Sequence, residues 1–211
     1  MKETFNFLFV IDVSGSMYGQ KIAAVNASLT ECLAELRQIG ASANYDIKVN
    51  IATFAEKMQL HILNEKPENI GAPHIKVEPQ TDGFYSVTSF TCLYKGLKYL
   101  FENKKIMDKK QGKNTFVFLF SDAKPVDGNE YKEVLDSIQQ CVEFKNSIKY
   151  VGFVEDEMDK YNKYTIRFVD YKADQIVRVS EIPGEIRKLQ MTFFSDQVSQ
   201  IENARYDQIF V

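Results

Sequence analysis

The stretch Phe5-Asn6-Phe7-Leu8-Phe9-Val10-Ile11-Asp12-Val13-Ser14-Gly15-Ser16 decides how this chain folds. Its first part is mostly apolar and rich in residues that favour strands, which predicts a strand buried on both faces, as in a parallel sheet. The chain then turns through Ser14-Gly15-Ser16 and enters a helical pattern. Asp12, Ser14 and Ser16 thus fall at the carboxyl end of a central strand, where open α/β sheets bind ligands. Alternating oxygen side chains on a glycine-containing turn suit a hard divalent cation such as Mg²⁺ or Ca²⁺.

Strand and helix patterns alternate along the rest of the chain. A link of only Ala55-Glu56-Lys57 is too short for a parallel crossover, so it implies an antiparallel hairpin with an edge strand. The alternation predicts a doubly wound α/β sandwich of the Rossmann-like kind, with a mostly parallel sheet and one antiparallel edge strand. Strands are expected over Phe5–Ile11, Ile47–Phe54, Met58–Leu63, Thr115–Ser121, Ile148–Val154 and Ile176–Val179, and helices over Gln20–Ile39, Cys92–Glu102, Glu130–Glu143 and Pro183–Phe194.

Three stretches have less regular patterns. Residues 64–90 are punctuated by Pro and Gly and contain one short candidate strand, Ile75–Val77. A short helix is expected within Glu155–Lys163. We place the domain at residues 1–195 and a C-terminal tail at 196–211, whose apolar end either docks on the domain or binds a partner.

A second aspartate is expected close to Asp12. Asp122 ends the apolar strand that begins at Thr115, and the expected strand order places this strand beside the first one. Two carboxylates that are remote in sequence would then meet across one crevice.

Composition excludes several classes of function. The chain has 211 residues, of which 45% are hydrophobic, and a net charge of −3, so no basic excess points to nucleic acid. The longest apolar run, Phe116–Phe120, is too short to span a membrane. The strand pattern from Phe5 leaves no room for a signal peptide. The 3 cysteines have no paired spacing and are expected to be buried reduced thiols, which favours a cytoplasmic protein.

The Asp12-x-Ser14-x-Ser16 pattern resembles the metal-ion-dependent adhesion site of von Willebrand factor A domains. The resemblance implies a threonine ligand at Thr91, where N-capping and ligation can coexist, and an aspartate ligand within Ser121-Asp122-Ala123-Lys124-Pro125. This chain has Ala123 where the family commonly has glycine, and Ser89-Phe90 where it often has Gly-Gly. Asp127 is expected to be a turn residue. The implied metal ligands are Asp12, Ser14, Ser16, Thr91 and Asp122.

Within that family the resemblance is closest to bacterial tellurite-resistance-type proteins. It is carried by Phe9 to Met17, by Gly19-Gln20-Lys21-Ile22 with Val25-Asn26, and by Phe193-Phe194-Ser195. The resemblance implies an adaptor in a bacterial stress-resistance or defence system, with a kinase or phosphatase of the same operon as a possible partner.

The expected function is non-enzymatic binding of a partner protein's Asp or Glu through the cation. A shell with few direct carboxylates leaves the ion electrophilic, and the helix that begins after Ser16 also favours an anion. Mg²⁺ is expected, with Mn²⁺ and Ca²⁺ left open. We assign no catalytic residue, because position 14 is serine rather than the second carboxylate of a haloacid-dehalogenase-like phosphatase. The alternatives are a metal-assisted hydrolase and a domain whose metal site is vestigial.

Overall fold

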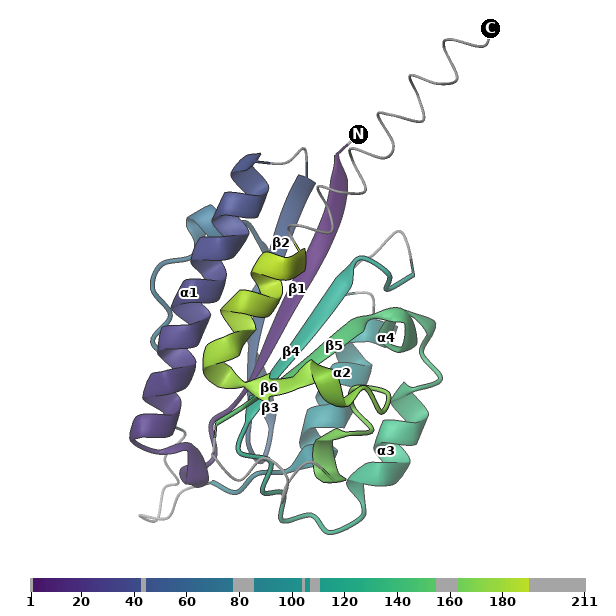
Figure 1. The fold of residues 1–211 in the computed structure, drawn as a ribbon. Coiled ribbons are helices and arrows are strands. Elements are labelled where there is room, and N and C mark those ends of the chain that lie inside the picture. The colour runs from purple at the N-terminus through teal and green to yellow at the C-terminus, as the bar shows by residue number, and fades with distance from the viewer. Residues whose placement is uncertain are drawn as a thin grey trace, which may run out of the picture.

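A six-stranded sheet between two layers of helices organises the protein (Figure 1). The computed structural model describes residues 2–42, 45–77, 86–103, 105–106, 111–154 and 163–189. Within these ranges the strand order is β3-β2-β1-β4-β5-β6. The strands are β1 (Glu3–Asp12), β2 (Tyr45–Phe54), β3 (Met58–Glu65), β4 (Thr115–Ser121), β5 (Ile148–Phe153) and β6 (Ile176–Arg178).

The sheet is parallel except at one edge. β1 pairs in parallel with β2 on one side and with β4 on the other, and β5 and β6 continue the parallel order. β3 pairs with β2 in the antiparallel direction, as the short link between them requires. The prediction of a doubly wound, mostly parallel sheet with one antiparallel edge strand is therefore confirmed.

Helices cover both faces of the sheet (Figure 1). On one face lie α1 (Gln20–Ser42) and a helical segment over residues 182–189. On the other lie α2 (Phe90–Glu102), α3 (Tyr131–Ile138) and α4 (Val142–Asn146). The described residues also contain short 3₁₀ turns: η1 (Gly15–Met17), η2 (Pro67–Asn69), η3 (Ala173–Gln175) and η4 (Val179–Glu181).

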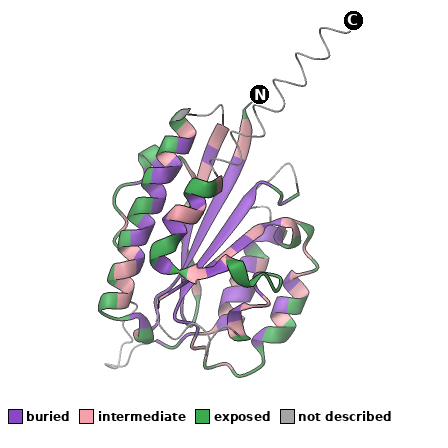
Figure 2. Ribbon diagram, viewed as in Figure 1, coloured by how far each residue is buried: buried purple, intermediate pink, exposed green. Residues whose placement is uncertain are grey.

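Alternation along β1 builds two separate cores. Phe7 and Phe9 pack beneath α1, whereas Leu8 and Val10 pack beneath α2 and α3, and the strand is buried along most of its length (Figure 2). The ring of Phe7 stacks on that of Phe116 of β4, with centroids 4.9 Å apart. Each such fully buried side chain stabilises the fold by about 1.5–3 kcal/mol. The strand that carries Asp12 is thus fixed by packing on both faces.

The segment expected to form a strand at Ile75–Val77 is not a strand. The side chain of Asn26 on α1 replaces a strand partner there. Its Oδ1 accepts from the Ile75 amide at 2.8 Å, and its Nδ2 donates to the Ile75 carbonyl at 2.9 Å. A single side-chain amide therefore satisfies the backbone groups that a neighbouring strand would have bonded.

The helix expected over Glu130–Glu143 is broken in two. α3 ends at Ile138, and Cys141 has an extended backbone with ψ 116° before α4 begins. The break buries Phe144 against Phe101 and leaves Val142 49% exposed. Tertiary packing of one aromatic ring thus overrides the continuous helical pattern.

The remaining differences concern cysteines and the end of the chain. All three cysteines are free thiols, but only Cys32 is buried, since Cys92 and Cys141 are partly exposed. Residues 182–189 form the start of the expected last helix. The expected residues 190–194 of that helix, most of the expected 155–163 helix and the 196–211 tail lie outside the described residues.

Candidate metal centre

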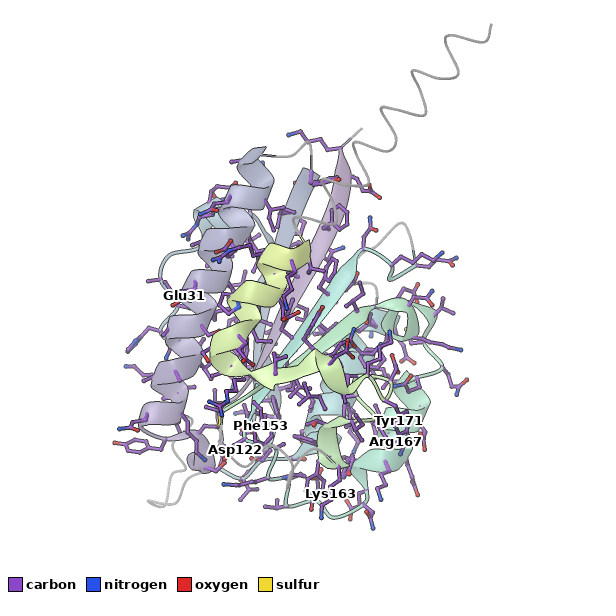
Figure 3. All side chains as sticks on the ribbon, viewed as in Figure 1. Glu31, Asp122, Phe153, Lys163, Arg167 and Tyr171 are labelled. Carbon is purple, nitrogen blue, oxygen red and sulfur yellow. The ribbon has the colours of Figure 1, made fainter. Side chains whose placement is uncertain are left out.

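The candidate centre lies at the carboxyl ends of the two middle strands. Asp12 is the last residue of β1 and Asp122 follows the last residue of β4, and β1 and β4 are hydrogen-bonded neighbours. The chain runs from β1 toward one edge and from β4 toward the other, which makes this the topological switch point of the sheet. Figure 3 labels Asp122 at this end of the sheet, close to the first turns of α1.

Asp12 is fully buried and is held by three donors. The Ser14 amide donates to its Oδ1 at 2.9 Å, and the Ser121 and Thr88 hydroxyls donate to its Oδ2 at 2.7 and 3.3 Å. The pKa of the Asp12 carboxyl is raised to about 6, mainly because burial disfavours its charged form. The hydrogen bonds to Asp12 oppose this increase, and the nearby charge of Asp122 adds to it. Asp12 is therefore held in one orientation by its hydrogen bonds, and a nearby cation would stabilise its charged form.

The two serines of the motif lie in one chain of hydroxyls. Ser14 Oγ is 2.7 Å from Thr88 Oγ1 and 3.1 Å from Ser16 Oγ. Ser14 is buried, whereas Ser16, in the 3₁₀ turn η1, is exposed. The Gly15 amide donates to the Ser86 carbonyl at 2.7 Å, which ties the motif loop to the segment before α2. The hydroxyl chain thus runs from the buried carboxylate to the surface.

Thr88 is a site residue that the sequence analysis missed. It is 2% exposed and contacts both Asp12 and Ser14. The only signal for it in the sequence is a hydroxyl-bearing residue three positions before Thr91, and this signal does not distinguish a turn residue from a site residue.

Thr91 does not cap α2, so the capping role that the sequence left open beside ligation is not its role. Ser89 holds that position, and its Oγ accepts from the Cys92 amide. Thr91 is the second residue of the helix, and its Oγ1 is buried with no hydrogen-bond partner. A buried hydroxyl without a partner is rare and costs stability, so it indicates a ligand or a strained site.

Asp127 has a larger role than the turn residue expected. Its carboxylate accepts from the Ser89 hydroxyl at 3.1 Å, from the Phe90 amide at 3.3 Å and from the Thr91 amide at 2.5 Å. It lies in the loop between β4 and α3, so it anchors the amino end of α2 to the loop that begins with Asp122. The position of Thr91 therefore depends on Asp127.

Asp122 is fully buried, and its two oxygens differ. Oδ2 accepts from Lys21 Nζ at 2.7 Å and lies 4.0 Å from Lys124 Nζ, whereas Oδ1 is buried with no hydrogen-bond partner. The next residue, Ala123, has φ 51°, the left-handed conformation that glycine adopts without strain. Alanine thus takes the backbone path that the family's usual glycine would favour.

The donor set fits a hard divalent cation. Carboxylates and hydroxyls are the oxygen ligands that Mg²⁺ and Ca²⁺ take, and Thr91 Oγ1 and Asp122 Oδ1 are both buried without a protein partner. Within the described ranges no group of three or more His, Cys, Asp or Glu side chains could hold a metal ion. A cation here would therefore depend on the hydroxyls as well as on Asp12 and Asp122.

Taken together, these features define a doubly wound α/β domain with an oxygen-lined site at its switch point. The chain belongs to the von Willebrand factor type A domain family, whose sequence profile matches residues 6–204. Domains of this family generally mediate protein–protein interaction and adhesion. No curated protein matches the sequence at a significant level.

Many solved structures share the fold, including the following two. The pilus adhesin SpaC from Lactobacillus rhamnosus GG, in its open conformation, has a TM-score of 0.64 at 10% identity over 90% of this chain. The chain spans only 30% of the length of that adhesin. An aerotolerance-related membrane protein from Bacteroides fragilis NCTC 9343, carrying multiple mutations to serines, has a TM-score of 0.55 at 10% identity, with 89% of this chain and 99% of that one covered. In the part of this chain that the structure describes, no helix has the length and apolarity to cross a membrane.

Proposed function

We propose that this domain is a non-enzymatic adaptor that binds an acidic group of a partner protein through a divalent cation. Asp12, Ser14, Ser16, Thr91 and Asp122 would hold the cation, with Mg²⁺ the first choice and Mn²⁺ or Ca²⁺ the alternatives. The cation would supply the positive charge that attracts a carboxylate of the partner. The observation that carries the proposal is the pair of buried oxygens, Thr91 Oγ1 and Asp122 Oδ1, that lack a protein partner.

The chemistry of the cluster favours binding over catalysis. Among the described residues, Asp12 is bonded to hydroxyls and one amide, and Asp122 to lysine, so no histidine or thiol is placed to activate a nucleophile in these contacts. His61 bonds to Thr53 at the β2–β3 edge instead. A phosphate-ester turnover screen with Mg²⁺ tests the alternative of a metal-assisted hydrolase.

The proposal extends to the setting of the protein. The resemblance of Phe9 to Met17 and the following residues to tellurite-resistance-type proteins supports an adaptor in a bacterial stress-resistance or defence system. A kinase or phosphatase encoded nearby is the proposed kind of partner. Three free thiols support a cytoplasmic location, where cysteines stay reduced.

Calorimetry and peptide binding test the function together. The purified chain is titrated with Mg²⁺, Mn²⁺ and Ca²⁺, and is then passed over immobilised peptides that contain Glu or Asp and matched peptides that contain Gln or Asn. We expect binding to the acidic peptides in Mg²⁺ and its loss in EDTA and in Thr91→Val. Equal binding to acidic peptides in EDTA, or no heat with any of the three metals, would contradict the proposal.

A domain with a vestigial metal site is the second candidate. The observation that favours it is the ion pair between Lys21 and Asp122, because an ammonium group can neutralise this carboxylate without a metal. A partner whose affinity is the same with and without EDTA would support this candidate over the first.

A further inference from the structure

The ammonium group of Lys21 is paired with Asp122, one of the residues proposed above as metal ligands. Lys21 Nζ donates to Asp122 Oδ2 at 2.7 Å from the first turn of α1. The Asp122 side chain is 0% exposed and that of Lys21 is 24% exposed. The contact therefore joins a buried anion at the end of β4 (Figure 3) to a partly exposed cation from the first turn of α1.

A buried carboxylate needs a counter-charge, and the structure gives Asp122 a specific one. An unpaired ionised group in the interior is strongly unfavourable, whereas an ion pair with good geometry recovers much of that cost. The other oxygen, Oδ1, has no hydrogen-bond partner. Lys124 Nζ is 4.0 Å from Oδ2, which is beyond hydrogen-bond distance, and its side chain is 34% exposed. The Lys21 ammonium group is thus the closer of the two to Asp122, and the Lys21 side chain is the less exposed.

A divalent cation and the Lys21 ammonium cannot both neutralise Asp122 without repelling each other. The lysine stem is long and flexible, and its partial exposure gives the ammonium group a route to solvent. A metal bound at Oδ1 would repel the Lys21 ammonium on Oδ2, and the free energy of this repulsion, or of the ion pair broken when Lys21 leaves, would be subtracted from metal affinity.

We propose that Lys21 is a tethered counter-ion that neutralises Asp122 in the metal-free protein and competes with the divalent cation for this carboxylate. The inference rests on the proposed function, since it assigns Asp122 to the metal. It makes two linked claims: Lys21 stabilises the metal-free fold, and Lys21 weakens the binding of metal. A lysine that merely packed at the surface would do neither.

The test compares Lys21→Gln with Lys124→Gln and Lys21→Arg in the full chain. Mg²⁺ and Mn²⁺ affinities are measured by calorimetry, and urea unfolding is followed in EDTA. We expect Lys21→Gln to bind Mg²⁺ at least fivefold more tightly than the unmodified protein and to unfold at a lower urea concentration in EDTA. Lys124→Gln should change Mg²⁺ affinity less than twofold, and Lys21→Arg, which keeps the positive charge, should retain the weaker affinity.

The outcomes separate this inference from the proposed function. If the unmodified protein binds metal and Lys21→Gln binds it equally or less tightly, competition by Lys21 is overturned while the metal site stands. If metal binds only to Lys21→Gln, competition is supported in its strongest form. If neither protein binds any of the metals, the metal site and the competition both fail. Unchanged urea unfolding of Lys21→Gln in EDTA would overturn the counter-ion role.

Discussion

The backbone amide of Thr91 donates a 2.5 Å hydrogen bond to Asp127 Oδ2, and this bond joins the start of α2 to the loop that follows β4. The same carboxylate accepts from the Phe90 amide and from the Ser89 hydroxyl. The carbonyl of Thr88 accepts from the Val126 amide in the same loop, at 3.0 Å. Three consecutive residues at the start of α2, Ser89, Phe90 and Thr91, are therefore bonded to one acidic residue that is not proposed to touch the metal.

Replacing Asp127 should weaken both the fold and the site. Asp127→Ala removes acceptors for two amides in the first turn of α2, so we expect a loss of about 1–2 kcal/mol in the free energy of unfolding. Because Thr91 would lose its anchor, Mg²⁺ affinity should fall as well. Urea unfolding and calorimetry measure the two effects. Asp127→Asn keeps one carbonyl oxygen and serves as the control, so its losses of unfolding free energy and of Mg²⁺ affinity should both be smaller. Equal losses in the two variants would contradict this account.

The two threonines near the centre should respond in opposite ways to replacement by valine. Thr91 Oγ1 is buried without a partner, so Thr91→Val removes an unsatisfied group and should raise metal-free stability by about 1 kcal/mol. Thr88 is bonded to Ser14 and Asp12, so Thr88→Val should lower stability by about 1–3 kcal/mol. Urea unfolding in EDTA distinguishes them. If Thr91→Val destabilised the protein as much as Thr88→Val, the hydroxyl of Thr91 would have a structural role in place of the ligand role assigned to it.

Lys149 is predicted to be a major source of stability outside the site. Its side chain is 1% exposed, and its ammonium group donates to the Phe144 and Ser147 carbonyls at 3.0 Å each and pairs with Asp170 at 2.9 Å. Burial lowers the pKa of Lys149, and the bond to Asp170 opposes that change. Lys149→Met would remove a donor from the Phe144 and Ser147 carbonyls and the ammonium partner of Asp170, so we expect a loss of about 3 kcal/mol in urea unfolding. Lys145, an exposed lysine on α4, provides the control, since Lys145→Met should change stability by less than about 0.5 kcal/mol.

Thiol labelling should single out Cys32. Burial raises the pKa of the Cys32 thiol to about 12, from 9.0. Because the folded pKa lies above the unfolded one, the protonated thiol contributes stability that is complete below pH 9 and is lost as the pH rises toward 12. At pH 8 the folded thiol is therefore both protonated and shielded from reagent. We expect a variant with Cys92→Ser and Cys141→Ser to resist a disulfide-exchange reagent until urea unfolds it, whereas Cys32→Ser should label in the folded state. Rapid labelling of the first variant would show that α1 opens locally.

Much of the fold could be predicted because it depends on local patterns. The apolar runs before Asp12 and Asp122 identify two buried parallel strands, and parallel strands that end in acidic residues at a switch point bring those residues together. The break at Cys141 could not be predicted, because it depends on the pocket that receives Phe144. The hydrogen bonds of Thr88 and Asp127 were also beyond prediction, because each joins segments that meet only after folding.

The central position of β1 has a further consequence for how the molecule opens. β1 shares ladders with β2 along its whole length and with β4 over Asn6–Ile11, and it is buried on both faces. In native-state hydrogen exchange, the amides of this strand should be among the last to be released, since they need global unfolding. Asp12 is therefore attached to the strand that we expect to exchange slowest, while the exposed Ser16 and the partly exposed Lys21 can change rotamer without moving that strand.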